Sequence, residues 1–488
     1  MIQNKSIRRT TAAIFIAAAV VYVLISLVNH YLFRTYALDL GFYTHIMYDY
    51  AHGRIDNFFM FDRAPLNVLS DHFDLYLMLL SPLVYVFGSY TLLIVQIVAV
   101  LLGGWGVFKL IRTYTDDEWI PLLAATAFLF SFGIIHALSF DYHSNVLTAM
   151  MLPWLLYYLR QRRFGLATLF VVLFVIGKEN MSLWLFFIAL GLLWDYRKDK
   201  KAVWFLVGYA AFALAYFVVI NMVVMPRLGN AGDSFKRYEW LGSSYPEIAK
   251  NLLSHPGKTL KIMFTNTTGW HGFDGIKAEF YCCALMSGML FTMLKPNYLL
   301  MLVPLFAQKM LSSSYGFWGF AGQYSVEFVP VLVISSFLVI MRLKQRPWRY
   351  AVSGILLCLV LMTTFYTVND PKEQIHPERL RLYSKEHYHQ EDFDIDYARH
   401  LIETVPKDGY ICAASIFVPR LAMRERIEDF EWNINTEAEY VLIPKSYIDM
   451  KAYGGETIFG HRDLFEVVET DGTLYLFKRK QVAQKQSY

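Results

Sequence analysis

The sequence has little charge and few cysteines, and several catalytic motifs are missing from it. Only 18% of the 488 residues are charged, whereas soluble globular proteins have about 25%. The four cysteines, Cys282, Cys283, Cys358 and Cys412, show no disulfide framework or metal-ligand spacing. There is no Walker motif, dinucleotide fingerprint or HExxH sequence. These absences argue against an ATP-driven pump and an intramembrane zinc protease.

Hydrophobic residues make up 56% of the chain, and the mean hydropathy is +0.34. They form long runs that are nearly free of charge, such as 98–108, 121–135 and 202–225. Such runs approach or reach the roughly 20 apolar residues needed to cross a bilayer. The net charge is only +4, and the basic residues fall in short clusters between apolar runs. The pattern predicts a multi-pass membrane protein whose partner is the lipid bilayer, with no nucleic-acid partner.

The basic clusters orient the chain, because cytoplasmic loops carry an excess of Lys and Arg. With every cluster in the cytoplasm, the apolar runs alternate as about eleven spans from a cytoplasmic N-terminus. The first run resembles a signal peptide, but no cleavage site precedes a soluble domain, so we interpret it as a retained first span. The clusters are Lys5/Arg8/Arg9, Lys109/Arg112, Arg160/Arg162/Arg163, Arg197/Lys198/Lys200/Lys201 and Arg342/Lys344/Arg346/Arg349. The predicted spans are 11–33, 90–111, 119–138, 144–159, 164–177, 181–195, 202–225, a hairpin of two spans around Lys295–Pro296, 325–342 and 350–368.

Two long loops, 34–89 and 226–278, are predicted outside the membrane. The first contains the apolar segment 72–88, which is short and breaks at Ser81–Pro82. We predict a helix that lies on or dips into the outer membrane face. A short true span is the alternative, but it would place Lys109 and Arg112 outside.

Charge, Pro, Asp and Gly return after residue 368, so we divide the chain into a membrane domain, 1–368, and a tail, 369–488. The tail is long enough for a small domain. Its pattern predicts a helix over 392–403 and buried strands over 410–414 and 440–443. A hairpin of strands 464–469 and 473–478 is predicted around Asp471–Gly472. The expected fold is an all-α membrane domain followed by a small extracytoplasmic α/β domain.

Ionisable residues close to membrane spans are expensive and are candidates for function. In the predicted topology they gather on the external side. A carboxylate there can take a proton from an acceptor hydroxyl, a lysine can neutralise a phosphate leaving group, and a histidine can do either or bind a metal. This chemistry suits a phosphorylated, lipid-linked substrate. The residues are Asp39, His45, Asp49, His52, Asp71, His72, Asp141, His143, Lys178, Glu179, Gln323, Tyr324 and Glu327.

Structural roles compete with these functional ones. Asp39 is placed to cap a helix that begins near Gly41, and Lys178 and Glu179 can form a structural pair. Asp141 and His143 can be loop residues that face water. The remaining features with a structural interpretation are a solvated turn at Asp116, Asp117 and Glu118 and close helix packing at Gly103, Gly104 and Gly106.

The first external loop resembles that of the GT-C glycosyltransferase superfamily. An aspartate follows the first span, and a stretch ending in Gly53–Arg54 comes next. The chain is also similar to a family of bacterial and archaeal multi-pass membrane proteins of unknown function in that clan. The similarity covers nearly the whole chain. His45 and Tyr48 depart from the glutamine and tryptophan expected in the first motif. The matching segments are DLGFYTHIMYDYAHGR, DHFDLYLMLLSPLVYVFG, FDYHSN, GKEN, GQYSVEFVP, VPKDGYICAAS and DGTLYLFKRK.

The resemblance implies an inverting transfer of a sugar from a polyprenyl-phosphate donor to an acceptor on the extracytoplasmic face of the cell (inner) membrane. Asp39 corresponds to the general base. The acceptor is a glycan, a lipid or a protein. Some superfamily members use a divalent cation, Mg²⁺ or Mn²⁺, and others do not. The residues expected to hold the donor phosphate or substrate are Asp71, His72, Asp141, His143, Lys178, Glu179, Gln323 and Tyr324.

Two other functions stay open. A transporter or flippase for a lipid or small solute would act without glycosyl transfer. Such proteins tend to show internal repeats and ionisable sites at the membrane midplane, which this sequence does not show. A scaffold whose tail binds a partner outside the membrane is the third hypothesis, and it requires residues 369–488.

Overall fold

The computed structural model describes residues 5–55, 60, 67–229, 236–370, 377–432, 437–448 and 463–480. Parts of both predicted external loops, including 56–59, 61–66 and 230–235, therefore lie outside the described residues. The chain divides into two compact units. Unit 1 contains residues 1–25, 69–76 and 95–381, and unit 2 contains residues 26–68, 77–94 and 382–488.

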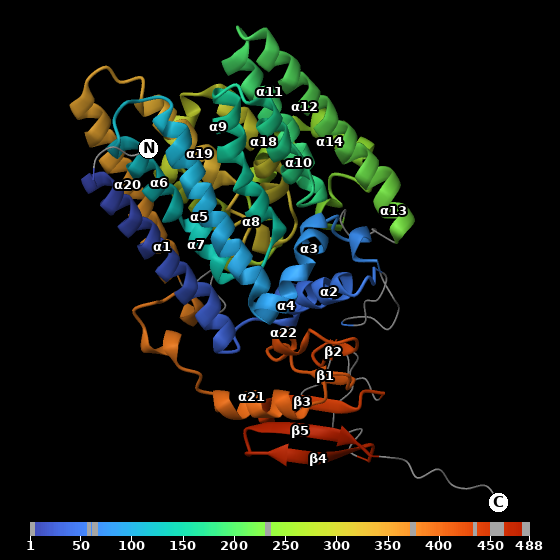
Figure 1. Ribbon diagram of the computed structural model, residues 1–488. Coiled ribbons are helices and arrows are strands. Elements are labelled where there is room, and N and C mark those ends of the chain that lie inside the picture. Colours follow the sequence, from blue (N-terminus) through green and yellow to red (C-terminus); the bar gives the residue numbers. More distant parts are fainter. Residues whose placement is uncertain are drawn as a thin grey trace, which may run out of the picture. The chain divides into compact units, whose positions relative to one another are not determined.

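Unit 1 is helical (Figure 1). The unit boundaries fall inside α1, α3 and α5, so each of these helices contributes residues to both units. The helices are α1 (Lys5–Tyr31), α3 (Leu75–Leu80), α5 (Thr91–Arg112), α6 (Trp119–Leu129), α7 (Phe132–Ser139), α8 (Ser144–Ala149), α9 (Met151–Arg160), α10 (Phe164–Val175), α11 (Glu179–Tyr196), α12 (Lys200–Val219), α13 (Met225–Leu228), α14 (Tyr245–Ser254), α15 (Pro256–Phe264), α16 (Ile276–Ala284), α17 (Leu290–Met293), α18 (Pro296–Met310), α19 (Phe328–Ile340) and α20 (Arg346–Asn369).

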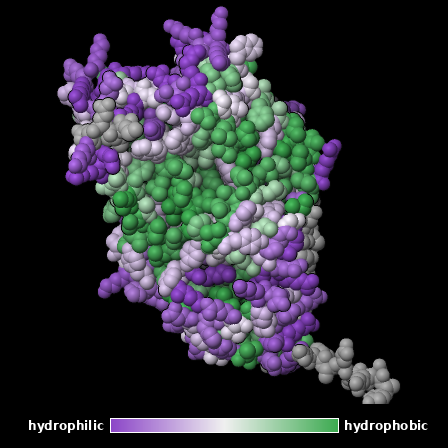
Figure 2. Space-filling model, viewed as in Figure 1, coloured by the Kyte–Doolittle hydropathy of each residue, from purple (hydrophilic) through white to green (hydrophobic). Residues whose placement is uncertain are grey.

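Each of the eleven predicted spans coincides with one or two of these helices. Within the described residues, four helical runs are long and apolar enough to cross a membrane: Lys5–Tyr31, Leu75–Arg112, Lys200–Leu228 and Arg346–Asn369. The pair α6 and α7, bent by 41°, would make a fifth. The helical positions are therefore confirmed, and the count of about eleven spans stays a prediction. Figure 2 shows apolar side chains over the flanks of the helices.

Several arginines of the basic clusters join neighbouring helix ends of unit 1. The Arg346 guanidinium pairs with Asp117 at 2.9 Å, which joins α20 to the turn after α5. The Arg162 guanidinium pairs with Asp199 at 2.7 Å, which joins the end of α9 to the start of α12. The Arg160 guanidinium lies over the Tyr114 ring, 4.5 Å from its centroid. These contacts join helix ends that carry four of the five clusters, and none of them involves Lys5, Arg8 or Arg9. The prediction that all five clusters share one side of the membrane stays a prediction.

Three glycines on α5 allow neighbouring helices to approach closely. A Cβ on Gly103 would lie 2.5 Å from the Met150 sulfur, and one on Gly104 would lie 2.6 Å from Leu129. A Cβ on Gly106 would lie 3.0 Å from Pro153. Only glycine fits such contacts without displacing a neighbour. The predicted packing role of these glycines is confirmed.

Unit 2 contains a five-stranded sheet of order β2-β1-β3-β5-β4. The first three strands in this order are parallel to one another. Strand β5 pairs antiparallel with β3 on one side and with β4 on the other. The central strands read as continuous apolar runs because both of their faces are buried. In Figure 1 helix α21 lies beside the sheet. The elements are α2 (Phe42–Ala51), α4 (Val84–Phe87), α21 (Ile395–Thr404), β1 (Ile411–Ala413), α22 (Val418–Leu421), β2 (Ile427–Asp429), β3 (Tyr440–Pro444), β4 (Phe465–Thr470) and β5 (Leu474–Arg479).

The predicted elements of the tail are confirmed, and two were missed. Helix α21 and strands β1, β3, β4 and β5 all lie within a few residues of the predicted ranges. Gly472 has φ +88°, so the Asp471–Gly472 turn needs a residue without a Cβ. Strand β2 and helix α22 were not predicted, because both are short. The segment 72–88 does break at Ser81–Pro82, where a 3₁₀ turn, Ser81–Leu83, separates α3 from α4.

Candidate functional site

Asp39 lies in a sharp turn directly after α1. It belongs to the π-helical turn η1 (Ala37–Gly41) and has φ 72° and ψ −91°, close to a γ-turn that non-glycine residues rarely adopt. Its residue is half-buried. Such a conformation costs on the order of 1–3 kcal/mol and persists only where the surrounding structure imposes it. An aspartate held in this way is a candidate for function.

The tail of the chain holds this turn within unit 2. The Ala37 N–H donates to the Ser415 hydroxyl at 3.0 Å. A Cβ on Gly41 would lie 2.9 Å from Val418 Cγ1, so the turn lies directly against α22. The Arg34 guanidinium donates to the carbonyl of His387 at 2.8 Å. Residues more than 350 positions apart therefore fix the backbone around Asp39.

The competing cap role of Asp39 concerns the N-cap position of α2, two residues after it. Gly41 occupies the N-cap position, and no side chain there bonds the first turn. Further along α2 the predicted helical spacing is confirmed, since His45 Nε2 lies 3.7 Å from Asp49 Oδ2. Arg54 also pairs with Asp49 at 2.7 Å. Burial raises the pKa of Asp49 and lowers the pKa of His45.

Asp141 and His143 are buried in unit 1, so the alternative that they face water is wrong. Asp141 has φ 47°, a left-handed conformation that aspartate tolerates better than most residues. Its carboxylate accepts from the Arg379 guanidinium at 2.7 Å, and both side chains are buried. Gln96 on α5 donates to the Asp141 carbonyl at 2.9 Å and accepts from the His143 N–H at 3.0 Å. The turn between α7 and α8 is therefore clamped from two sides.

His72, Lys178 and Glu179 meet in unit 1. The Lys178 ammonium donates to His72 Nε2 at 3.3 Å, and His72 Nδ1 lies 3.4 Å from the Glu179 carboxylate. The other Glu179 oxygen accepts from the Phe73 N–H at 3.1 Å. Because Nε2 accepts, a neutral His72 carries its proton on Nδ1, facing Glu179. Asp71 is exposed and lies 3.9 Å from His72 Nε2. The predicted pair of Lys178 and Glu179 is thus organised around a histidine.

A second polar cluster surrounds Glu327, which is buried at the start of α19. Its carboxylate accepts from Asn145 Nδ2 at 2.7 Å, and the same amide lies 3.4 Å from the Gln323 carbonyl. The buried Lys309 ammonium donates to the Tyr324 carbonyl at 3.3 Å. Lys178 is also close enough to act electrostatically on Glu327. Gln323 and Tyr324 therefore contribute backbone carbonyls to this cluster.

Close packing joins these segments at one end of unit 1. A Cβ on Gly177, next to Lys178, would lie 1.9 Å from Thr148 Oγ1 on α8 and 2.7 Å from the Tyr76 ring on α3. A Cβ on Gly322 would lie 3.7 Å from the Phe140 ring, beside Asp141. The four predicted motifs that contain His72, Asp141, Lys178 and Gln323 therefore come together. Asp39 belongs to the other compact unit.

Sequence reasoning missed three side chains that hold this cluster. Gln96 lies in an apolar run of the sequence. A single amide side chain in such a run indicates that it forms hydrogen bonds to buried groups. Lys309 is buried and donates to carbonyls around Gly319 and Tyr324. Arg379 comes from the segment after α20, and no local pattern connects it with Asp141.

A metal ion held by the protein would need several His, Cys, Asp or Glu side chains close together. Among the described residues, no three His, Cys, Asp or Glu side chains are grouped as a metal site. The expectation of a divalent cation, Mg²⁺ or Mn²⁺, stays a prediction. The four cysteines are free thiols, of which Cys283 and Cys412 are buried and Cys282 and Cys358 are exposed.

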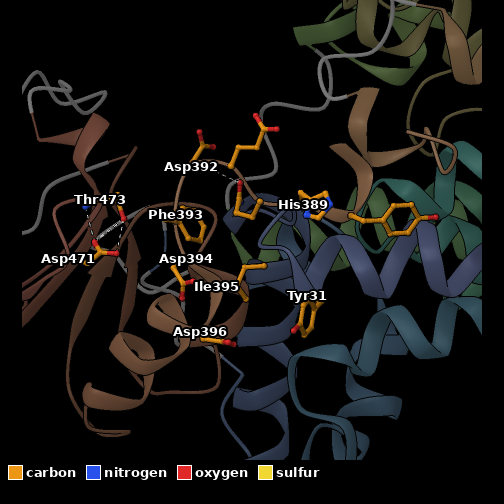
Figure 3. A pocket seen from close by; sticks show the side chains of 12 residues that line it. Tyr31, His389, Asp392, Phe393, Asp394, Ile395, Asp396, Asp471 and Thr473 are labelled. Atoms are coloured by element: carbon orange, nitrogen blue, oxygen red, sulfur yellow. Dashed lines mark hydrogen bonds between the residues drawn. The ribbon is translucent and has the colours of Figure 1, made fainter. Parts of the chain in front are cut away.

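An open cavity of about 600 Å³ in unit 2 contains none of the predicted site residues. It lies at the start of α21, beside the β4–β5 turn (Figure 3). Three of its five carboxylates have structural roles: Asp394 accepts from the Tyr397 N–H, Asp396 pairs with Arg399, and Asp471 closes the hairpin turn. The cavity is lined by Tyr31, residues 388–396, Asp471 and Thr473.

The chain is similar to several solved structures. ArnT from Cupriavidus metallidurans in the apo state is similar with a TM-score of 0.50 and 12% identity, over 96% of this chain and 97% of that one. The apo oligosaccharyltransferase of Archaeoglobus fulgidus gives 0.45 and 12%, over 96% and 74%. Arabinofuranosyltransferase AftD from Mycobacteria gives 0.47 and 12%, over 97% and 40%. A comparison with curated protein sequences gave no significant match.

The long apolar helices and the small sheet form a fold that is similar to that of ArnT. The chain belongs to the family described as "Predicted membrane protein (DUF2079)", whose model matches residues 29–458. The expected family is therefore confirmed.

Proposed function

We propose that this protein is an integral membrane glycosyltransferase that moves a sugar from a polyprenyl-phosphate donor to an acceptor hydroxyl on the extracytoplasmic face of the cell membrane. The observation that carries the proposal is Asp39, an acid held in a strained turn directly after a long apolar helix. The GT-C-like fold supports the same kind of reaction.

In the proposed reaction the acceptor oxygen attacks the anomeric carbon while the bond from that carbon to the phosphate oxygen breaks. The acceptor proton passes to the Asp39 carboxylate, and polyprenyl phosphate leaves with the bonding electrons. A single displacement inverts the configuration at the anomeric carbon. The acceptor is a glycan, a lipid or a protein with a free hydroxyl.

The polar end of unit 1 is proposed to bind the phosphate of the donor. The Lys178 ammonium supplies a positive charge, and His72, which lies between Lys178 and the Glu179 carboxylate, supplies a second polar group beside it. Asp71, Asp141, His143, Gln323 and Tyr324 stay candidates for substrate binding. Asp141 and Gln323 have structural partners within the cluster, so we propose that they position it.

The test is incorporation of label from polyprenyl-phosphate sugars into membrane acceptors by the purified protein in vesicles. Asp39→Asn should lower incorporation by at least about 100-fold, as expected for loss of a positioned base. Asp116→Asn, the same change at an exposed turn, is the matched control and should keep full activity. Equal incorporation by wild type and Asp39→Asn would rule out the proposed base.

Lys178→Met tests phosphate binding separately from the base. It should raise the KM for the lipid donor more than it lowers kcat, because it removes a contact with the donor phosphate. Movement of a labelled lipid across the vesicle bilayer, without any sugar transfer, would instead favour a flippase.

A further inference from the structure

Helices α14 and α15 form an amphipathic element in the predicted second external loop. They meet at His255, which ends one helix and precedes the other. Several large apolar side chains of this element, and Trp270 in the loop that follows it, are largely exposed. The exposed fractions are 83% for Leu253, 59% for Leu260, 59% for Phe264 and 73% for Trp270. Leu260 and Phe264 are four residues apart, so they share one face of α15.

The opposite side of the element is fixed to the helical bundle. The Lys277 ammonium donates to the carbonyls of Ile262 at 2.7 Å and Met310 at 2.8 Å. The Tyr281 hydroxyl donates to the Met263 carbonyl at 3.2 Å. Helix α15 is thus attached by its backbone to α16 and α18. Its exposed apolar face is held in a defined direction by these contacts.

The exposed apolar face continues onto the flank of the bundle. The Phe264 ring stacks on Tyr281 of α16 with centroids 4.9 Å apart, and Tyr281 stacks on Phe306 of α18 at 5.7 Å. Further along the chain, Leu290 and Met293 of α17 and the adjacent Leu294 are also exposed. The apolar surface therefore runs from the loop helices to helices that we predict to lie in lipid.

The charge of the element selects the kind of lipid. Residues 236–275 contain five Lys or Arg and three Asp or Glu, a net charge of +2. Lys250, Lys258 and Lys261 are exposed on α14 and α15. Lysines that flank an apolar helix face can keep their stems in the membrane interface and reach lipid phosphates.

We propose that α14 and α15 lie in the interfacial layer of an anionic bilayer. Leu253, Leu260, Phe264 and Trp270 enter the acyl boundary, and the three lysines contact phospholipid headgroups. A surface of apolar side chains flanked by lysines is more complementary to an anionic lipid surface than to a partner that is only apolar or only acidic. This binding surface does not depend on glycosyl transfer.

The test uses the full chain in lipid nanodiscs, with Cys282→Ser and Cys358→Ser removing the exposed thiols. Leu260→Cys carries an environment-sensitive fluorophore. Lipids with a spin label near the headgroup should quench it at least about twofold more than iodide does, as expected for a side chain at the interface. Asp116→Cys is the control, an exposed turn residue that should show the reverse preference. If iodide alone quenched the fluorophore on Leu260→Cys, the proposal would be wrong. It would also be wrong if neither quencher reached the fluorophore because a second protein covered this surface.

A second measurement tests the lysines. In nanodiscs containing phosphatidylglycerol, the fluorophore should emit at shorter wavelength than in nanodiscs of phosphatidylcholine alone. The triple variant Lys250→Gln, Lys258→Gln, Lys261→Gln should remove this difference. Identical spectra for the unsubstituted chain in both lipids would refute the preference for anionic lipid.

Discussion

Arg379 and Asp141 form a buried ion pair at 2.7 Å although 238 positions separate them in the chain. The pair fixes the turn that carries His143 against the segment that follows α20. Each charge is isolated from water, so each depends on the other for compensation.

Removing one partner of this pair should destabilise the protein strongly. Arg379→Ala is expected to cost about 3–5 kcal/mol, because it leaves a buried carboxylate without its counter-charge. Thermal unfolding in detergent, compared with wild type, measures the loss. The double variant Arg379→Ala, Asp141→Asn should recover part of it, because asparagine carries no charge and tolerates the left-handed conformation of residue 141. A double variant as unstable as the two single losses combined would show that the two side chains do not interact.

Asp39 should trade stability for function. Asp39→Gly removes the Cβ from a residue at φ 72°, and the relief of strain is expected to raise the free energy of unfolding by about 1 kcal/mol. Asp39→Val should lower it by about 1–2 kcal/mol, because a branched side chain fits a left-handed conformation poorly. Both variants should lose sugar transfer. Asp116→Gly is the control, and a larger gain there would indicate that strain at Asp39 is not the cause.

Asp429 should make the stability of the protein depend on pH. Burial, with the nearby Glu431 carboxylate as a second cause, raises the pKa of Asp429 from 3.8 to about 7. Between these pH values the folded chain binds a proton that the unfolded chain has released, so stability should fall as pH rises from about 4 to 7.

The lost stability amounts to on the order of 4 kcal/mol for a shift of this size. Asp429→Asn keeps the shape of the side chain without the charge, so its unfolding temperature should change less over this pH range. Equal pH dependence in Asp429→Asn and wild type would contradict this assignment.

Gly177 should not tolerate a side chain. Gly177→Ala places a Cβ at 1.9 Å from Thr148 Oγ1, and overpacking of this kind costs about 1–3 kcal/mol. Gly208→Ala, a helical glycine with open space around it, is the matched control and should stabilise by up to about 1 kcal/mol. Thr148→Ala should partly rescue Gly177→Ala in thermal unfolding. No difference between the two glycine variants would mean that α8 does not contact Gly177.

Local patterns in the sequence predicted most of the helices and the hairpin of the tail. The Asp471–Gly472 turn was visible because two alternating runs flank a residue pair typical of hairpins. Strand β2 was not, since Ile427–Asp429 is three residues long and lies among charges. The Arg379–Asp141 pair was also out of reach, because side chains so far apart in sequence leave no periodic signal. The positive φ of Asp39 follows from packing against α22 and could not be predicted from its neighbours in the chain.

The hydrogen bond from Ala37 to Ser415 has a consequence for biosynthesis. The turn that bears Asp39 leaves the ribosome early, but the residues that fix it are translated about 380 residues later. At roughly 5–20 residues per second, tens of seconds pass before these partners exist. A nascent or truncated chain would therefore have its first helices in place while the turn around Asp39 lacks the contacts that shape it. The turn around Asp39 would therefore become ordered only in chains whose C-terminal residues have been translated and folded.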